Sequence, residues 1–182
     1  MRIIGGKLSG KVILPPDGYK ARPTTDFAKE GLFNILDNEY DFTDLKILDL
    51  FGGTGAISLE FASRGVGEVT CIEMAQPHVN FIKSTIARFG MADVVKVLHY
   101  NVFDYLPVCG RKFDIVFADP PYAIEGLDTL PEKVFAADIL FPGAYFILDH
   151  PGEYSFKENP YFLKERKYGN VHFSFFMKPE SE

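Results

Sequence analysis

Scarce cysteine and the absence of long apolar runs exclude several classes of protein for this 182-residue sequence. Cys71 and Cys109 lack the spacing of a metal site or a disulfide framework. No apolar run approaches the roughly 18 residues of a membrane-spanning helix. The first residues have neither an apolar core nor a small-residue cleavage site, so no signal peptide is indicated. We therefore expect a cytoplasmic protein with reduced thiols and no membrane partner.

The sequence also lacks a metal-binding motif and internal repeats. The four histidines are scattered, no metal constellation is present, and we assign no histidine to catalysis. The sequence has no internal repeat and no low-complexity segment, and its 47% hydrophobic and 24% charged residues are ordinary for a globular protein. We expect a monomer with one domain over residues 1–182, in which residues 1–40 extend a catalytic core of residues 41–182.

Positive charge is scarce overall but concentrated at the start of the chain. The formal net charge is −6, which argues against a general nucleic-acid binder. Residues 1–22 nevertheless hold five basic residues against Asp17 alone, a net charge of +4, so the remaining residues carry −10. This basic arm fits a local anionic partner or a merely solvated edge. Its basic residues are Arg2, Lys7, Lys11, Lys20 and Arg22.

Apolar periodicity predicts strands that alternate with helices. We expect two short strands around a glycine-rich turn in residues 2–16, then a helix over 26–40 with Thr25 or Asp26 as its N-cap. Helices over 56–63, 76–89 and 127–139 alternate with five buried strands, and residues 161–169 and 170–178 form two more. This order predicts a doubly wound, mostly parallel seven-stranded sheet with a C-terminal antiparallel hairpin and an N-terminal hairpin and helix.

Four polar residues lie at the predicted carboxyl ends of strands, which is where such sheets bind ligands. They are Asp49, Glu73, Asn101 and Asp119. The glycines of "LDLFGGTG" (Gly52, Gly53 and Gly55) allow a tight turn and close approach of a ligand, but the third glycine of a dinucleotide motif is missing.

The acids around this loop favour a particular cofactor. A carboxylate at Asp49 would repel a pyrophosphate but would suit a cationic end, such as the amino-acid part of S-adenosylmethionine. Glu73, 18 residues past Gly55, is placed to accept hydrogen bonds from ribose hydroxyls. Asn101 could meet an adenine amino group. A surface acid, a helix cap or another nucleotide site remains the alternative interpretation for each feature alone.

The stretch "FADPPY" ends a buried strand with an acid, two prolines and an aromatic. Transfer of a methyl group to an exocyclic amine requires the amine to be held and its protons to be accepted. Asp119 and the carbonyl of Pro120 could accept those protons, Pro121 would stiffen the backbone, and Tyr122 offers a face on which a base can stack. The other interpretation is a strand-ending turn with a buried tyrosine.

These motifs resemble those of a known family. "ILDLFGGTGAISLEFASRG", "CIEM", "YNVFDYL" and "FADPPY" are similar to the amino-methyltransferase motifs of the Rossmann-like class I S-adenosylmethionine fold. "MRIIGGKLSGKVILPP" and "ARPTTDFAKEGLFNIL" closely resemble the start of the bacterial 16S rRNA guanine-N2 methyltransferase family (RsmD).

The resemblance implies S-adenosylmethionine as cofactor and N2 methylation of a guanine in 16S rRNA, within the small ribosomal subunit or its assembly intermediate. It places Phe51, Met74 and Val102 at the cofactor, beside the residues named above. It also places Arg22 and Thr24 near the active site, and we expect Lys7, Lys11, Arg22 and Thr24 to contact RNA.

Three other functions remain open. A DNA adenine or cytosine amino-methyltransferase shares "DPPY" but normally needs a further domain. A protein glutamine methyltransferase usually carries Asn in place of Asp119. An RNA-binding ribosome assembly factor that is not an enzyme would not need both the cofactor loop and the amine site.

Overall fold

A seven-stranded sheet forms the centre of the computed structural model, which describes residues 1–21 and 24–180. The strand order is β3-β2-β1-β4-β5-β7-β6. β1 to β5 are parallel, and β7 pairs antiparallel with both β5 and β6. The strands are β1 (Lys46–Asp49), β2 (Glu68–Glu73), β3 (Val95–His99), β4 (Phe113–Ala118), β5 (Leu140–His150), β6 (Phe162–Tyr168) and β7 (Val171–Met177).

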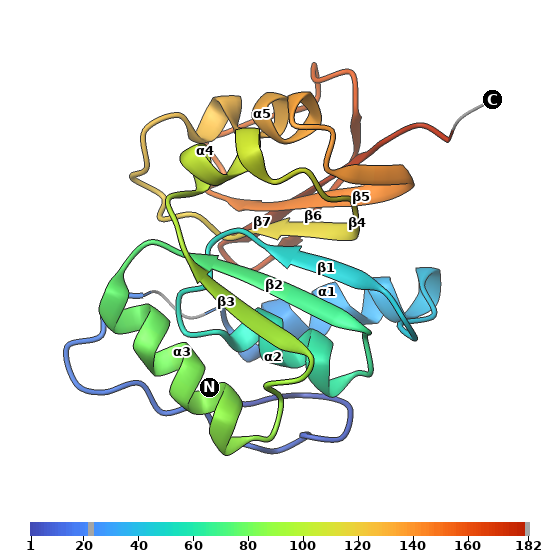
Figure 1. Ribbon diagram of the computed structural model, residues 1–182. Coiled ribbons are helices and arrows are strands. Elements are labelled where there is room, and N and C mark those ends of the chain that lie inside the picture. Colours follow the sequence, from blue (N-terminus) through green and yellow to red (C-terminus); the bar gives the residue numbers. More distant parts are fainter. Residues whose placement is uncertain (22–23, 181–182) are drawn as a thin grey trace.

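Helices cover both faces of the sheet (Figure 1). One face carries α1 (Asp26–Glu39), α2 (Ala56–Ser63) and α3 (Gln76–Arg88), and the other carries α4 (Val102–Tyr105), η1 (Leu106–Val108), η2 (Leu127–Thr129) and α5 (Leu130–Ala136). Neighbouring strand residues point to opposite faces, so Ile47 belongs to the core under α1 to α3 and Leu48 to the core under α4 and α5. Burial on both faces explains why the strands are nearly continuous apolar runs.

The structure confirms the predicted mostly parallel sheet and its C-terminal antiparallel hairpin. The Thr25 side chain accepts a hydrogen bond from the Ala28 backbone, so Thr25 and not Asp26 is the N-cap of α1. The helix predicted over 127–139 is shorter, because a 3₁₀ turn precedes α5 and Asp138 takes a positive φ of 52°. The short helix α4 has no counterpart in the prediction.

The two strands predicted for residues 2–16 reduce to one antiparallel bridge between Arg2 and Val12. The amides of Ile3, Gly10 and Ile13 still donate to carbonyls across the turn, but the next two donors of the first segment point to a side chain. The Glu60 carboxylate accepts from the amides of Ile4 (2.8 Å) and Gly5 (2.9 Å). Glu60 also forms a fully buried ion pair of 3.3 Å with Lys29 of α1. This carboxylate therefore fastens the N-terminal segment to α1 and α2.

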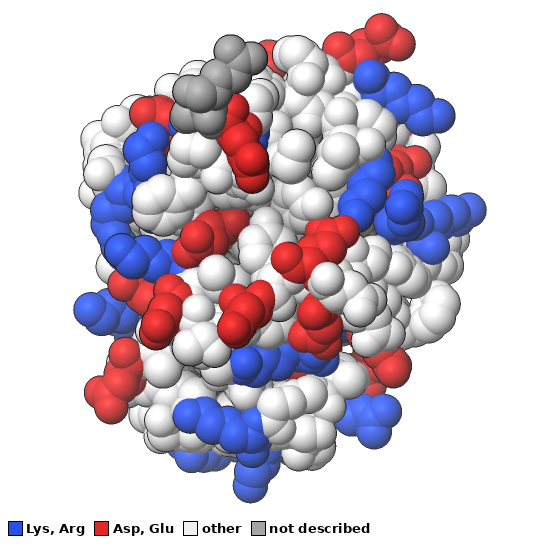
Figure 2. Space-filling model, turned by 90° about the vertical axis from the view of Figure 1, so that its right-hand side faces the viewer, with Lys and Arg blue, Asp and Glu red and all other residues white. Residues whose placement is uncertain are grey.

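Acidic side chains mark the end at which the parallel strands begin. Figure 2 shows the right-hand side of Figure 1, where acidic side chains gather in the middle of the face. The parallel strands begin on this side, and their carboxyl ends lie on the opposite side.

Within residues 1–21 and 24–180, no helix is long and apolar enough to cross a membrane.

Candidate active site

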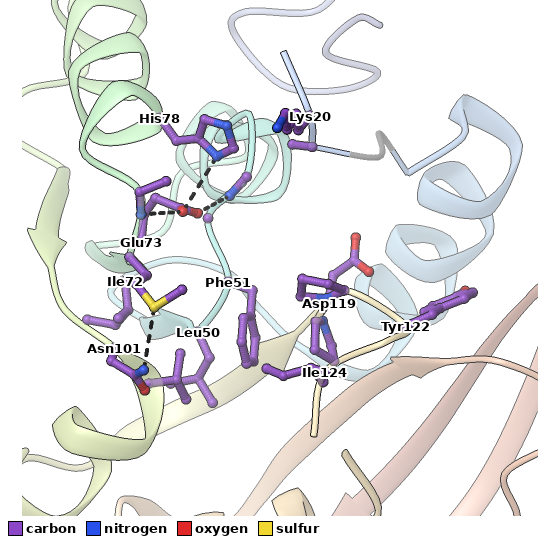
Figure 3. A pocket seen from close by; sticks show the side chains of 18 of the residues that line it. Lys20, Leu50, Phe51, Ile72, Glu73, His78, Asn101, Asp119, Tyr122 and Ile124 are labelled. Atoms are coloured by element: carbon purple, nitrogen blue, oxygen red, sulfur yellow. Dashed lines mark hydrogen bonds and ion pairs between the residues drawn. The ribbon is translucent and has the colours of Figure 1, made fainter. Parts of the chain in front are cut away.

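A pocket of about 970 Å³ opens at the carboxyl ends of β1, β2 and β4. Figure 3 shows Phe51 between two groups of side chains, with Glu73 and Asn101 on one side and Asp119 and Tyr122 on the other. One cavity therefore joins the two motifs that the sequence singled out. Predicted site residues on its wall are Thr24, Phe51, Gly52, Gly53, Glu73, Met74, Asn101, Val102, Asp119, Pro120, Pro121 and Tyr122.

The glycines of the loop after β1 meet distinct steric demands. A Cβ on Gly52 would lie 2.6 Å from Sγ of Cys71, so the loop passes too close to β2 for a side chain. Gly55, the N-cap of α2, has a φ of 81°, which L side chains rarely adopt. Gly55 does not line the pocket itself; it shapes the turn that brings Gly53 there.

Glu73 holds this loop by its carboxylate. Its Oε2 accepts from the Gly53 amide at 2.8 Å, and its Oε1 accepts from the Ala75 amide at 3.0 Å. Nδ1 of His78 lies 3.5 Å from Oε1. Each oxygen keeps a second lone pair, so the carboxylate can still accept from two hydroxyls of a ligand.

Asn101 caps α4, because its Oδ1 accepts from the Phe103 amide at 2.9 Å. Its Nδ2 points toward Sδ of Met74 at 3.4 Å. Apolar side chains complete this end of the pocket, namely Leu50, Ile57, Ile72, Val102 and Phe103. A slot with apolar walls, an amide at one end and a carboxylate nearby fits the adenosine part of S-adenosylmethionine.

Asp49 lies beneath the glycine loop and not on the pocket wall. It is 1% exposed, and its Oδ2 accepts from Oγ of Ser58 at 2.7 Å. Desolvation raises the pKa of this carboxyl to about 7, Ser58 opposes the shift, and the Glu73 charge adds to it. Asp49, predicted to bind the cofactor, is not among the residues that line the pocket, and its hydrogen bond to Ser58 joins α2 to β1.

Asp119 follows β4 directly and receives a hydrogen bond from Thr24. Oγ1 of Thr24 lies 3.1 Å from Oδ2 of Asp119. The hydroxyl of Tyr122 donates to Oδ1 of Asp149 at 2.7 Å, and Asp149 is fully buried near the end of β5. The turn is closed by the Ile124 amide, which donates to the carbonyl of Pro121 at 3.0 Å. Each end of "DPPY" is thus bonded to a different part of the chain.

The basic arm divides into two parts. The Lys7 amide donates to the carbonyl of Ser63, the last residue of α2, so Lys7 lies about 12 Å along that helix from the glycine loop. Lys11 is exposed and bonded to Leu8 and Ile3 in the same turn. The structure does not bring Lys7 and Lys11 to the pocket.

The later part of the arm reaches the pocket. The Tyr19 hydroxyl donates to the carbonyl of Gly53, and its ring stacks on His78 at 4.1 Å. Lys20 and Thr24 line the cavity. Arg22, which was predicted to contact RNA, lies outside the described residues.

Sequence reasoning missed several residues of the pocket, including Lys20, His78, Phe103, Ile124 and Lys133. Lys133 belongs to α5, and its Nζ lies 4.6 Å from the centre of the Phe103 ring. Asp149 carried no motif in the sequence. The only available signal was its place near the end of a buried strand, the same signal that pointed to Asp49 and Asp119.

Fold and site together define a Rossmann-like methyltransferase architecture. A solved structure, the putative methyltransferase yhhF from Escherichia coli, is 29% identical and superimposes with a TM-score of 0.84 over 100% of this chain and 99% of that chain.

The family follows from the sequence match. The model of the family described as "Conserved hypothetical protein 95" matches residues 1–177, and the chain belongs to this family, the RsmD family. Ribosomal RNA small subunit methyltransferase D of Buchnera aphidicola is 28% identical over 181 residues, which cover 97% of this chain and 91% of the relative. The protein of that name from Escherichia coli K12 is 37% identical over 122 residues, 67% of this chain and 60% of the relative.

Proposed function

We propose that this protein uses S-adenosylmethionine to methylate the exocyclic N2 amine of a guanine in 16S rRNA of the small ribosomal subunit. The observation that carries the proposal is the single pocket that joins the glycine loop and Glu73 to Asp119 and Tyr122. Relatives named ribosomal RNA small subunit methyltransferase D support the substrate class. A ribosomal substrate places the protein in the cytoplasm.

The Glu73–Asn101 end of the pocket is the part that would hold the cofactor. When bound, S-adenosylmethionine supplies a methyl group activated by its sulfonium charge. Glu73 would accept hydrogen bonds from the ribose hydroxyls with the lone pairs that Gly53 and Ala75 leave free. Asn101, Met74 and Val102 would hold the adenine, and Phe51, which lies between the two groups of side chains, would stand between cofactor and base.

Asp119 and Pro120 hold the amine. Guanine presents N1–H and N2–H side by side, and a carboxylate accepts from such a pair, whereas adenine and cytosine place an acceptor nitrogen next to the amine. Thr24 fixes the orientation of the Asp119 carboxylate through its hydrogen bond. The Pro120 carbonyl accepts the second N2 proton, so the amine is gripped from two sides. Asp119 also stabilises the positive charge that develops on the amine nitrogen as the methyl group leaves sulfur, and the nitrogen then releases one proton to solvent.

The test is methyl transfer from radiolabelled S-adenosylmethionine to four substrates: 16S rRNA transcript, small subunits, duplex DNA and a release factor. We expect label only in rRNA, with N2-methylguanine as the product after nuclease digestion and mass spectrometry. The Asp119→Ala variant is the matched control for background transfer. Label in DNA or in a release-factor glutamine, or the methyl group on another base, would overturn the proposal.

A further inference from the structure

Phe27 is an aromatic side chain at the protein surface next to the pocket. It is 65% exposed and is the most exposed large aromatic of the described residues. It lies in the first turn of α1, three residues after Thr24, whose hydroxyl bonds to Asp119. Most of its surface is therefore open to a ligand at the protein surface.

The ring of Phe27 packs against the ring of Tyr168, and α1 has a gap in its surface where Tyr168 lies. The two ring centres are 5.6 Å apart at an interplanar angle of 81°. A Cβ on Gly31 would lie 2.2 Å from the Tyr168 ring, so only glycine fits there. Glycine inside a helix is less favourable than alanine. The glycine at position 31 therefore leaves room for the Tyr168 ring against α1.

Tyr168 connects Phe27 to the rim of the pocket. β6 runs in the same direction as β5, since both are antiparallel to β7, so Tyr168 ends β6 on the side where β5 ends. Tyr168 packs on Phe173 at 6.0 Å, and Phe173 pairs in register with Asp149, the partner of Tyr122. Phe27 and Tyr168 therefore stand beside the amine end of the pocket, away from the adenosine end.

An exposed cation lies close to these rings. Arg166 is exposed and lies two residues before Tyr168, on the same face of β6. The preceding residue of that face, Lys164, pairs with Glu39 at 2.8 Å, whereas none of the ion pairs between described residues uses Arg166.

We propose that Phe27, Tyr168 and Arg166 form a platform for single-stranded RNA beside the target nucleotide. A neighbouring base stacks on Phe27, Tyr168 supports that ring, and Arg166 contacts the phosphate backbone. Aromatic rings with an adjacent cation are the elements from which single-strand binding surfaces are made. The inference rests on the proposed function and adds the surface by which the enzyme holds RNA outside the pocket.

The first test measures binding of 16S rRNA transcript and of small subunits by Phe27→Ala. We expect binding to both to weaken about 5- to 150-fold, the equivalent of roughly 1–3 kcal/mol for one stacked base. Phe27→Tyr should retain wild-type binding. Val108→Ala is the control, because Val108 is 66% exposed and lies in η1, before the start of β4. Calorimetry with S-adenosylmethionine should give the same affinity for all variants.

Two further variants test the other members of the platform. Gly31→Ala should weaken RNA binding without changing cofactor affinity, because the added methyl group displaces Tyr168. Arg166→Gln should lower the slope of log K against log salt by about 1, and Arg166→Lys should restore it. Lys46→Gln, which removes a charge at the start of β1, should leave the slope unchanged.

The outcomes separate this inference from the proposed function. If the wild-type protein methylates rRNA but Phe27→Ala binds both substrates normally, the platform is wrong and the proposed function stands. If Phe27→Ala weakens binding to subunits alone, the surface contacts a ribosomal protein and the RNA platform is wrong. If the wild-type protein methylates none of the rRNA substrates, the proposed function itself fails.

Discussion

Thr24 donates a hydrogen bond of 3.1 Å to Asp119, a residue 95 positions further along the chain. The contact ties the N-terminal segment to the strand end that carries "DPPY". Thr24, which precedes α1, therefore helps to form the wall of the pocket. Four predictions follow from this geometry and from the contacts around the cofactor end.

Replacement of Thr24 by valine should slow methyl transfer without changing cofactor affinity. Valine keeps the shape of threonine but removes the hydroxyl that orients the Asp119 carboxylate. A hydrogen bond to a charged group is worth about 1.5–3 kcal/mol, so single-turnover rates should fall roughly 10- to 100-fold. Thr24→Ser keeps the hydroxyl and should stay close to wild type. Equal rates for the valine and serine variants would show that the hydrogen bond has no part in catalysis.

Variants of Asp119 should rank by the charge and the acceptor that they keep. Asp119→Asn retains an acceptor oxygen, and Asp119→Ala loses both oxygen and charge. We expect the rate to fall from Asp to Asn to Ala, with a loss on the order of 10²–10³ for removal of one preorganised partner. Single-turnover methylation at saturating cofactor and RNA measures the effect. An alanine variant with nearly wild-type rate would assign the acid to the turn and not to the chemistry.

Glu73→Ala should weaken binding of S-adenosylmethionine by a few kcal/mol at most. Two charge-assisted hydrogen bonds of roughly 1.5–3 kcal/mol each would be exchanged for bonds to water. Glu73→Gln should be intermediate. Glu68→Ala is a suitable control, because Glu68 begins the strand that Glu73 ends and pairs with Arg111. Unchanged affinity in a folded Glu73→Ala protein, measured by calorimetry, would remove Glu73 from the site.

The buried Asp49 should make the protein less stable as pH rises from about 4 to about 7. Its folded-state pKa is raised to about 7 from 3.8 by desolvation. Below pH 4 the carboxyl is protonated in both states, so there is no penalty. Between these values the unfolded chain releases the proton and the folded chain holds it, so folding loses about 1.4 kcal/mol per pH unit. Above pH 7 the loss is constant.

Urea unfolding at pH 5 and pH 7 tests this titration. The wild-type protein should lose up to about 3 kcal/mol more than Asp49→Asn over this range, because asparagine does not ionise. Ser58→Ala should raise the pKa of Asp49 further, since the Ser58 hydroxyl stabilises the charged form. Parallel pH curves for wild type and Asp49→Asn would show that Asp49 does not titrate in this range.

Local patterns were enough to predict the sheet and the position of its ligand edge. The signals for strand ends depend only on residues that are close together in the sequence, such as an apolar run, the glycine turn and the start of a helix at Ala56. They therefore show where β1, β2 and β4 end. Asp49, Glu73 and Asp119 were placed at strand ends for this reason, and the structure has them there. The prediction could not say which of these carboxylates faces the ligand.

The tertiary structure alone decided which residues meet. Asp49 turns to Ser58 beneath the loop, while Glu73 and Asp119 line the pocket. The Glu60 carboxylate takes the amides of Ile4 and Gly5, 56 and 55 residues away, so these two residues do not continue the predicted N-terminal hairpin. The sequence by itself determined the alternation of strands and helices and the residues at their ends, because these depend on neighbours along the chain. The contacts Thr24–Asp119 and Tyr122–Asp149 depend on how distant segments pack, because a buried donor or acceptor must find its partner wherever the fold brings one.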